Sequence, residues 1–203
     1  SAWYGKFNMN TTITLRDGDE EYLHLFQADT YILKGGEEEI FVPAFTYHGF
    51  RYVLVEGLND DQVTDDILTY IVFNTNVEKR SGFNCSDNIL NTLYDMGINS
   101  DLSNFMHIPT DCPAREKNGW TDDASMSACQ FLLSFDISEN LRMWMQNIGF
   151  AQREDGMLPG VVPTHSWGYH WGNGPVSDSA IINLPYYVYK FCGRTDVFEE
   201  NTE

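Results

Sequence analysis

Hydrophobic and polar residues alternate in the first part of the chain, as they do in strands that are buried on one face. The run TTITLR alternates from Thr12 to Leu15, and TYILKG, EIFVPAF, FRYVLVEG and ILTYIVFNTNV are short runs rich in β-branched and aromatic residues. Turn residues such as Gly35-Gly36 separate these runs. Short strands at close spacing are typical of antiparallel sandwiches. The pattern therefore predicts part of an antiparallel β-sandwich over residues 1–80.

The hydrophobic period lengthens in the run CSDNILNTLYDMGINSDLSNFM. Ile89, Leu93 and Met96 recur every three or four residues, which is the spacing of one helical face. Ser86 or Asp87 precedes this face, and either side chain can cap the first turn of a helix. The pattern therefore predicts a first helix here and leaves open which of the two residues caps it.

Later runs have the same helical period, namely residues 122–134, SENLRMWMQNIGFAQ and DSAIINLPYYVYKFCG. In the last run, Pro185 should kink the helix or mark its true start. Gly193 suits the position just past the end of that helix. A further helical segment opens at TDVFEENTE.

Strands followed by helices, with no Pro/Ser-rich linker between them, predict an α+β chain of two domains. We expect the β-sandwich portion over residues 1–80 and a helical barrel or toroid over residues 81–203. About four helices and an incomplete fifth are too few to close such a barrel. The chain is therefore expected to be a fragment that works together with the rest of its own polypeptide.

The charge of the chain excludes some classes of partner. Its 30 acidic and 12 basic residues give a formal net charge of -18, the opposite of what binding to nucleic acid or an anionic membrane needs. No apolar run reaches the ~18 residues of a membrane helix. Four widely spaced cysteines show no CxxC or Cys/His spacing, so we expect neither a metal nor a cofactor. Neutral ligands remain open, and an aromatic content of 14% suits sugars.

Candidate chemistry is concentrated in PTDCPAREKNGWTDD, residues 109–123. Its prolines block a helix at the start and a helical run follows, so its acidic residues should lie on a rigid loop. Glycoside hydrolysis needs a protonated carboxyl, a second carboxylate, hydroxyl acceptors and a face for stacking. We expect Glu116 to be the acid, because it is the one Glu of the run and has the longest reach. Asp111 and Asp123 would accept sugar hydroxyl hydrogens, and Trp120 would stack on the ring.

Each of these residues also has a purely structural interpretation. Glu116 could pair with Arg115 or Lys117, since ion-pair networks use the same residue types as acid catalysis. Asp123 could serve the first turn of the following helix, where negative charge is favoured. Trp120 could be a core tryptophan. The loop by itself leaves these alternatives open.

Residues 153–178 form a second candidate loop, longer than the ~12–15 residues of a plain connector and rich in Trp and Tyr. Trp167, Tyr169, His170 and Trp171 offer a second stacking surface, and Trp171 is the residue of this set that we expect to bind the sugar. His165 and His170 do not have a recognised metal-ligand spacing, so no metal is expected there. Asp178 precedes an apolar helix and is either its cap or a hydroxyl acceptor.

The run PTDCPAREKNGWTDDA resembles the signature of the bacterial α-L-rhamnosidases of glycoside hydrolase family 78. In that family an Asp-Cys-Pro start is followed by a Glu five residues on, then by a Trp and a second Asp. Here these positions are Asp111, Glu116, Trp120 and Asp123. The upstream runs FTYHGFRYVLVEGL and SGFNCSDNILNTLYDMGINSDLSNFMHIP resemble the C-terminal part of the family's β-sandwich and its first barrel helix.

The resemblance implies an (α/α)6 barrel that removes terminal α-L-rhamnose with inversion at the anomeric carbon. By the family's pattern Glu116 is the general acid, the two aspartates of the signature bind the rhamnose, and Trp120 helps to wall its pocket. Trp171 and Asp178 look like the family's later sugar-pocket positions. The family's general base lies on a later part of the barrel, beyond Glu203, so we expect the fragment alone to be inactive.

Two alternatives stay open beside this interpretation. The chain could belong to another α/α-barrel glycosidase with a different sugar preference, or to an inactive carbohydrate-binding protein on the same scaffold. Stacking alone needs no group of carboxylates, so the acidic loop favours an enzyme. The substrate class points to a periplasmic or extracellular location, which the sequence itself does not determine.

Overall fold

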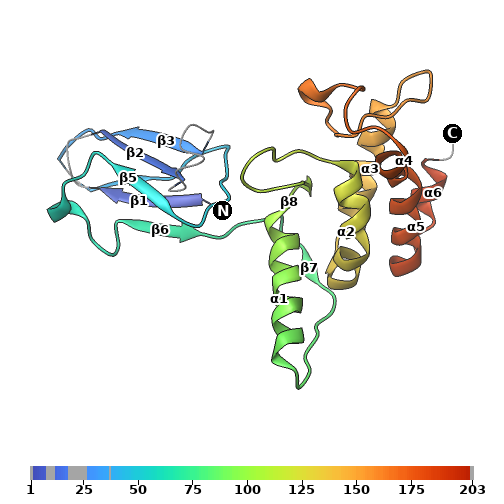
Figure 1. Cartoon of the computed structure of the whole chain (residues 1–203), viewed down its shortest axis with the longest axis horizontal. Coiled ribbons are helices and arrows are strands. Elements are labelled where there is room, and N and C mark those ends of the chain that lie inside the picture. Colours follow the sequence, from blue (N-terminus) through green and yellow to red (C-terminus); the bar gives the residue numbers. More distant parts are fainter. Residues whose placement is uncertain (1, 8–11, 18–26, 37, 202–203) are drawn as a thin grey trace. The chain divides into compact units, whose positions relative to one another are not determined.

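A computed structural model describes residues 2–7, 12–17, 27–36 and 38–201 (Figure 1). The chain divides into two compact units. The first, called the strand unit here, comprises Ser1–Phe73 with Pro113–Arg115, and the second, the helical unit, comprises Asn74–Cys112 with Glu116–Glu203. The main division therefore falls between residues 73 and 74, a little before the boundary at 80 that the sequence predicts.

Two antiparallel sheets of three strands each lie in the described part of the strand unit, in the orders β4-β1-β6 and β3-β2-β5. The strands are β1 (Ala2–Phe7), β2 (Thr12–Asp17), β3 (Ala28–Ile32), β4 (Glu39–Phe41), β5 (Val53–Glu56) and β6 (Leu68–Ile71). A short 3-10 helix, η2 (Asp60–Gln62), precedes β6. The central strand β2 pairs Leu15 with Asp29 on one side and with Val55 on the other. The strands predicted from the alternating runs are thus confirmed.

A small core supports the described strands. Leu33 and Ile67 are buried, and the rings of Tyr31 and Phe41 stack on one another with centroids 4.6 Å apart. The hydroxyl of Tyr31 donates a hydrogen bond of 2.8 Å to Glu39. This packing joins residues of β3 and β4, which belong to different sheets.

The helical unit contains the helices α1 to α6 among its described residues (Figure 1). They are α1 (Asn88–Ser103), α2 (Thr121–Ser134), α3 (Ser138–Ala151), α4 (Pro175–Asp178), α5 (Ala180–Cys192) and α6 (Asp196–Glu199), with the 3-10 helix η3 (His165–Trp167). Four short strands accompany them, β7 (Glu78–Lys79), β8 (Phe105–Met106), β9 (Ile108–Pro109) and β10 (Phe135–Asp136).

Helix α1 begins as the sequence predicts, and the structure decides between the two candidate caps. The carboxylate of Asp87 accepts a 2.8 Å hydrogen bond from the backbone N–H of Ile89, which satisfies one of the free donors of the first turn. The apolar face of α1 does not enter the core that the described residues form, because Ile89, Leu93 and Met96 are all more than half exposed. The spacing of these residues predicted the helix correctly, but it did not predict which side of the helix is buried.

The core of the helical unit lies among α2, α3 and α5. Leu132, Leu141 and Leu184 are almost completely buried there. Trp144 of α3 is fully buried, and its indole N–H donates a 2.9 Å hydrogen bond to the backbone carbonyl of Val162. A buried indole needs such a partner, because its N–H loses water on folding. Helix α3 is therefore fixed to the second candidate loop as well as to its neighbouring helices.

Helix α5 runs through its proline. It begins at Ala180, so the expectation that Pro185 marks the start of the helix is wrong. Pro185 is buried within the helix, where burial of the apolar ring offsets the loss of one backbone hydrogen bond. Gly193 has φ 69° and ψ 13°, the left-handed conformation that follows many helices, which confirms the predicted end.

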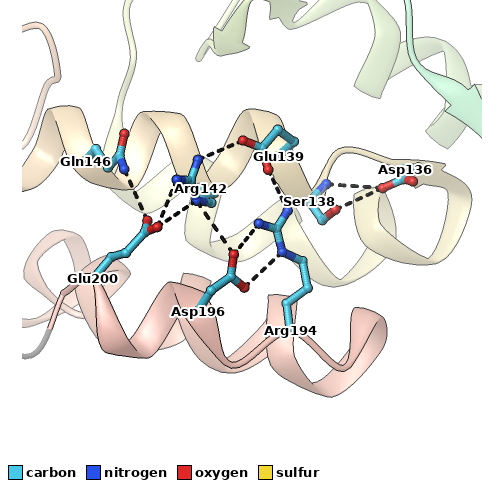
Figure 2. Close-up of polar contacts among 8 residues, drawn as sticks. All are labelled: Asp136, Ser138, Glu139, Arg142, Gln146, Arg194, Asp196 and Glu200. Atoms are coloured by element: carbon cyan, nitrogen blue, oxygen red, sulfur yellow. Dashed lines mark hydrogen bonds and ion pairs between the residues drawn. The ribbon is translucent and has the colours of Figure 1, made fainter.

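A network of charged side chains joins α3 to α6 (Figure 2). Arg142 donates to Glu139 at 2.7 Å and to Glu200 at 2.8 Å. Arg194 donates to Glu139 at 2.7 Å and also pairs with Asp196. Hydrogen bonding from Arg194 is the main cause that lowers the pKa of both Glu139 and Asp196. The ionised network therefore stabilises the docking of the short C-terminal helix.

We predict that the substitution Arg194→Gln lowers the melting temperature at pH 7 and has less effect at pH 3. The folded-state pKa values of Glu139 and Asp196 lie below their unfolded values of about 4, so their contribution is present above pH 4 and is lost as the pH falls. Thermal melts monitored by circular dichroism measure this. The control is Arg153→Gln, since Arg153 pairs with Asp155 on an exposed loop. An equal loss for Arg194→Gln at both pH values would contradict the assignment.

Candidate active site

The two candidate loops lie backbone against backbone along what we call the loop seam, residues 119–121 and 160–162. The N–H of Thr121 donates to the carbonyl of Gly160 at 2.9 Å, and the N–H of Val162 donates to the carbonyl of Gly119 at 2.8 Å. A Cβ on Gly119 would lie 2.2 Å from the Val162 carbonyl oxygen, so this approach requires glycine. The seam brings together loops that are far apart in the sequence.

Asp111 closes the first loop onto itself. Its Oδ1 accepts a 2.9 Å hydrogen bond from the N–H of Asn118, and its own N–H donates to the Asn118 carbonyl at 3.0 Å. The sulfur of Cys112 accepts a 3.2 Å bond from the N–H of Glu116. Carboxylate and sulfur thus satisfy backbone groups of a segment without regular structure. Asp111 has a structural role in addition to the predicted binding role.

Glu116 lies on this loop with its side chain exposed. Its Oε2 accepts a 2.7 Å hydrogen bond from the indole N–H of Trp120, four residues later. Because indole is a donor with no acceptor capacity, this bond fixes one carboxylate oxygen and leaves the other available. The sequence placed both residues in the site but did not predict that they bind one another.

Asp111 and Asp123 line the same cavity, which has a volume of about 200 Å³. Its polar walls also include Ser100 and Asp101 of α1, Asn104 just past the end of α1, and Ser127 of α2. Glu116 is not among the residues that line this cavity. The structure therefore brings the two predicted sugar-binding aspartates together, while the predicted acid lies outside the lining of their cavity, on the loop that carries Asp111.

The carboxyl of Asp123 has a raised pKa. Partial burial is the main cause, followed by the negative charges of Asp122 and Asp111. Asp122 and Asp123 both lie in the first turn of α2, where the helix dipole favours negative charge. One oxygen of Asp122 is buried without a hydrogen-bond partner. Three carboxylates therefore lie close together here, and one of their oxygens has no hydrogen-bond donor from the described residues.

Three tryptophans form a chain of edge-to-face contacts next to the loop seam. Trp120 meets Trp167 with centroids 5.3 Å apart, and Trp167 meets Trp171 at 6.2 Å. Trp171 is 67% exposed, which leaves much of its side chain open to a ligand. Gly172 allows its backbone to lie against the ring of Trp120, because a Cβ at position 172 would lie 2.1 Å from Cζ3 of that ring. The structure therefore joins two of the predicted stacking residues through a third.

Asp178 ends the short helix α4 and lies elsewhere. It lines a second, more open hollow of about 680 Å³ together with Asp155, Met157, Asn173 and other residues. Neither Asp111 nor Asp123 is among the residues of that hollow. In this chain the structure does not unite Asp178 with the two other aspartates in one cavity.

Among the residues that the structure describes, no three His, Cys, Asp or Glu side chains are arranged as metal ligands. In the same residues no helix has both the length and the apolar surface that crossing a membrane requires.

Sequence reasoning missed Asp101, a buried carboxyl in the wall of the cavity. Its signal in the sequence is weak, since one Asp on a helix is ordinarily exposed.

Comparisons with known families place this site in context. Residues 78–203 match the family described as bacterial alpha-L-rhamnosidase 6 hairpin glycosidase domain. Residues 8–73 match the bacterial alpha-L-rhamnosidase concanavalin-like domain. The two matches together span nearly the whole chain, and they divide close to the boundary between the strand and helical units.

Individual proteins agree with these matches. An alpha-L-rhamnosidase of Streptomyces avermitilis is 33% identical over 174 residues, which is 85% of this chain and 16% of that protein. One from Formosa agariphila is 34% identical over 184 residues, or 84% of this chain and 19% of the relative. The chain thus spans less than a fifth of the length of these curated relatives.

Solved structures of alpha-L-rhamnosidases also resemble the fold. One from Streptomyces avermitilis, complexed with L-rhamnose, has a TM-score of 0.88 and 28% identity, covering 98% of this chain and 20% of that one. One from Dictyoglumus thermophilum has a TM-score of 0.86 and 32% identity, covering 99% of this chain and 24% of that one. Fold and sequence together place residues 78–203 in the class of six-hairpin glycosidase domains. The chain belongs to the bacterial α-L-rhamnosidases of glycoside hydrolase family 78, as the signature loop predicted.

We predict that Gly172→Ala disturbs the tryptophan chain. The new Cβ would overlap Trp120, and the positive φ of 71° adds backbone strain. The near-ultraviolet circular dichroism of the coupled indoles should change and the melting temperature should fall. Gly156→Ala is the matched control, since it has φ 85° but no atom within 4 Å of the added Cβ. Identical near-ultraviolet spectra for the two variants would contradict this account of the contact.

Proposed function

We propose that this chain carries the acid side of an inverting α-L-rhamnosidase site. Glu116 delivers a proton to the oxygen that leaves the anomeric carbon, while Asp111 and Asp123 accept hydrogen bonds from hydroxyls of the sugar. The observation that carries the proposal is the cavity that these two aspartates share, Asp111 from the loop that also holds Glu116 and Asp123 from the first turn of α2. The structure of a rhamnose-bound relative, to which the fold is similar, supports the choice of sugar.

The proposed proton transfer requires that the carboxyl of Glu116 is held in a fixed orientation. The indole N–H of Trp120 holds Oε2 of Glu116 at 2.7 Å, so the other oxygen can carry and donate the proton. The same indole ring touches Trp167, which continues to the exposed face of Trp171. We propose that these rings wall the sugar pocket and stack against the apolar face of the ring. We keep Asp178 as a hydroxyl acceptor of the second hollow, apart from the cavity of Asp111 and Asp123.

An inverting mechanism also requires a base. The two carboxyls of inverting glycosidases lie ~6.5–9.5 Å apart, so that a water molecule fits between the base and the sugar. We assign this base to polypeptide outside residues 1–203, on a later part of an (α/α)6 barrel that follows the β-sandwich portion. The relatives are more than five times as long as the part that this chain covers, which leaves room for such a segment. By this proposal residues 1–203 alone do not turn over substrate.

We predict that Glu116→Gln, made in the intact protein, lowers kcat on an aryl α-L-rhamnoside by about 10²–10⁴-fold, the usual contribution of general acid catalysis. The amide cannot donate a proton of comparable acidity, but it preserves the shape and the acceptor for Trp120. The melting temperature should stay unchanged. Glu154→Gln, at an exposed position of the second loop, is the matched control.

Three results would separate the proposal from its alternatives. Retained activity of Glu116→Gln would remove Glu116 from the role of acid. Comparison of aryl rhamnosides, glucosides and mannosides would identify a different sugar preference. Binding of L-rhamnose by the intact protein without any hydrolysis would identify a carbohydrate-binding protein instead.

A further inference from the structure

Asp101 is a buried carboxyl in the wall of the candidate cavity. It lies in the last turns of α1, its exposed fraction is 7%, and it lines the cavity together with Asp111 and Asp123. Among the described residues its one side-chain hydrogen-bond partner is Gln130 of α2, whose Nε2 donates to Oδ2 at 3.0 Å. The second carboxylate oxygen therefore has no protein partner and is available to the cavity.

The position of Gln130 depends on a glycine in α1. A Cβ on Gly97 would lie 2.7 Å from Nε2 of Gln130, so an alanine there would push the amide away from Asp101. Glycine in the interior of a helix is less stable than alanine. Helix α1 therefore has a glycine, a poor helix former, at the position where a side chain would keep Gln130 from Asp101.

The charge on Asp101 is not neutralised within the cavity. Desolvation raises its pKa to about 7, and the hydrogen bond from Gln130 partly opposes this. The loop presents Asp111 and α2 presents Asp123, while the other side chains that line the cavity are uncharged. A buried carboxyl whose partner is an amide costs stability and is a common feature of functional sites.

Unpaired acceptors in the cavity indicate the chemistry of a ligand. Oδ1 of Asn104, another lining residue, is buried without a hydrogen-bond partner. A ligand that matches this cavity must bring donors, and it must be small, because about 200 Å³ is below the ~300–1,000 Å³ of pockets for drug-sized ligands. The hydroxyl groups of a neutral sugar residue meet both conditions.

We propose that Asp101 is a further substrate-binding residue, whose carboxylate, oriented by Gln130, accepts a hydrogen bond from a hydroxyl of the sugar held by Asp111 and Asp123. This inference rests on the proposed glycosidase function. It assigns a third aspartate to the pocket, from helix α1 and not from the signature loop. The carboxylate form is the better acceptor, so binding should strengthen as the pH rises through 7.

The test uses Asp101→Asn in the intact protein, with KM on an aryl α-L-rhamnoside and the Kd of L-rhamnose measured from pH 5.5 to 8.5. At pH 8 both constants should rise about tenfold, the loss expected for one hydrogen bond to a charged group, while kcat is unchanged. At pH 5.5 wild type and variant should agree, because Asp101 is then protonated. Asp95→Asn, an exposed aspartate of the same helix, is the matched control and should behave as wild type.

Stability distinguishes a binding role from a structural one. The folded-state pKa of Asp101 is raised to about 7 from an unfolded value of about 4, so the cost of burying its charge builds up as the pH rises from about 4 to 7 and is complete above 7. Asp101→Asn should therefore melt at a higher temperature than wild type at pH 8, although it binds sugar less tightly. A variant that is more stable and binds sugar as well as wild type at pH 8 would overturn the proposal.

Gly97→Ala tests the part assigned to Gln130. Alanine should preserve or increase the stability of α1, while displacement of the amide raises KM in the same direction as Asp101→Asn. An unchanged KM in Gly97→Ala would overturn that part. If Glu116→Gln abolishes turnover while Asp101→Asn leaves KM and Kd unchanged at every pH, the inference fails and the proposed function stands.

Discussion

The close approach of two backbones at the loop seam is the constraint on which the site depends. The N–H of Val162 donates a hydrogen bond to the carbonyl of Gly119 across the seam, and there is no room for a side chain at position 119. On one side the seam fixes the acidic loop and the start of α2, and on the other it fixes the loop of tryptophans. The Val162 carbonyl also accepts from the buried Trp144, so the seam is fixed to the helical core. Catalytic groups on loops need such a rigid support.

The helical unit uses its charged side chains in two opposite ways. Between α3 and α6, arginines and carboxylates are paired, so that the charges stabilise the fold. In the cavity the carboxyls of Asp111 and Asp123 lie near one another, and the resulting repulsion helps to raise the pKa of Asp123. Hydroxyl donors from a neutral ligand would relieve this repulsion without adding charge. The net charge of -18 is therefore compatible with a sugar site in a way that it is not with a nucleic-acid site.

Much of the local structure followed from periodicity and from a few special residues. The strands β2 to β6, the helices α1, α2, α3, α5 and α6, the cap at Asp87 as one of two candidates and the end of α5 at Gly193 were predictable. Such features depend on neighbours in the sequence, because alternation, capping and left-handed glycine are local properties. Of the two alternatives for Pro185, a kink or the start of α5, the start is wrong, because a buried position can retain a proline inside a helix when packing offsets the lost hydrogen bond.

The sequence by itself determined the family, which the spacing of Asp111, Glu116, Trp120 and Asp123 predicted, and it supplied the candidates for the chemistry. Only the tertiary structure decided how they associate. It joined Trp120 to Glu116, placed Asp178 away from the other two aspartates and brought Asp101 into their cavity. These relations depend on how α1, α2 and two distant loops pack in space. Spacing along a chain carries no record of that packing, because contacts between distant segments are fixed by burial and by backbone hydrogen bonds.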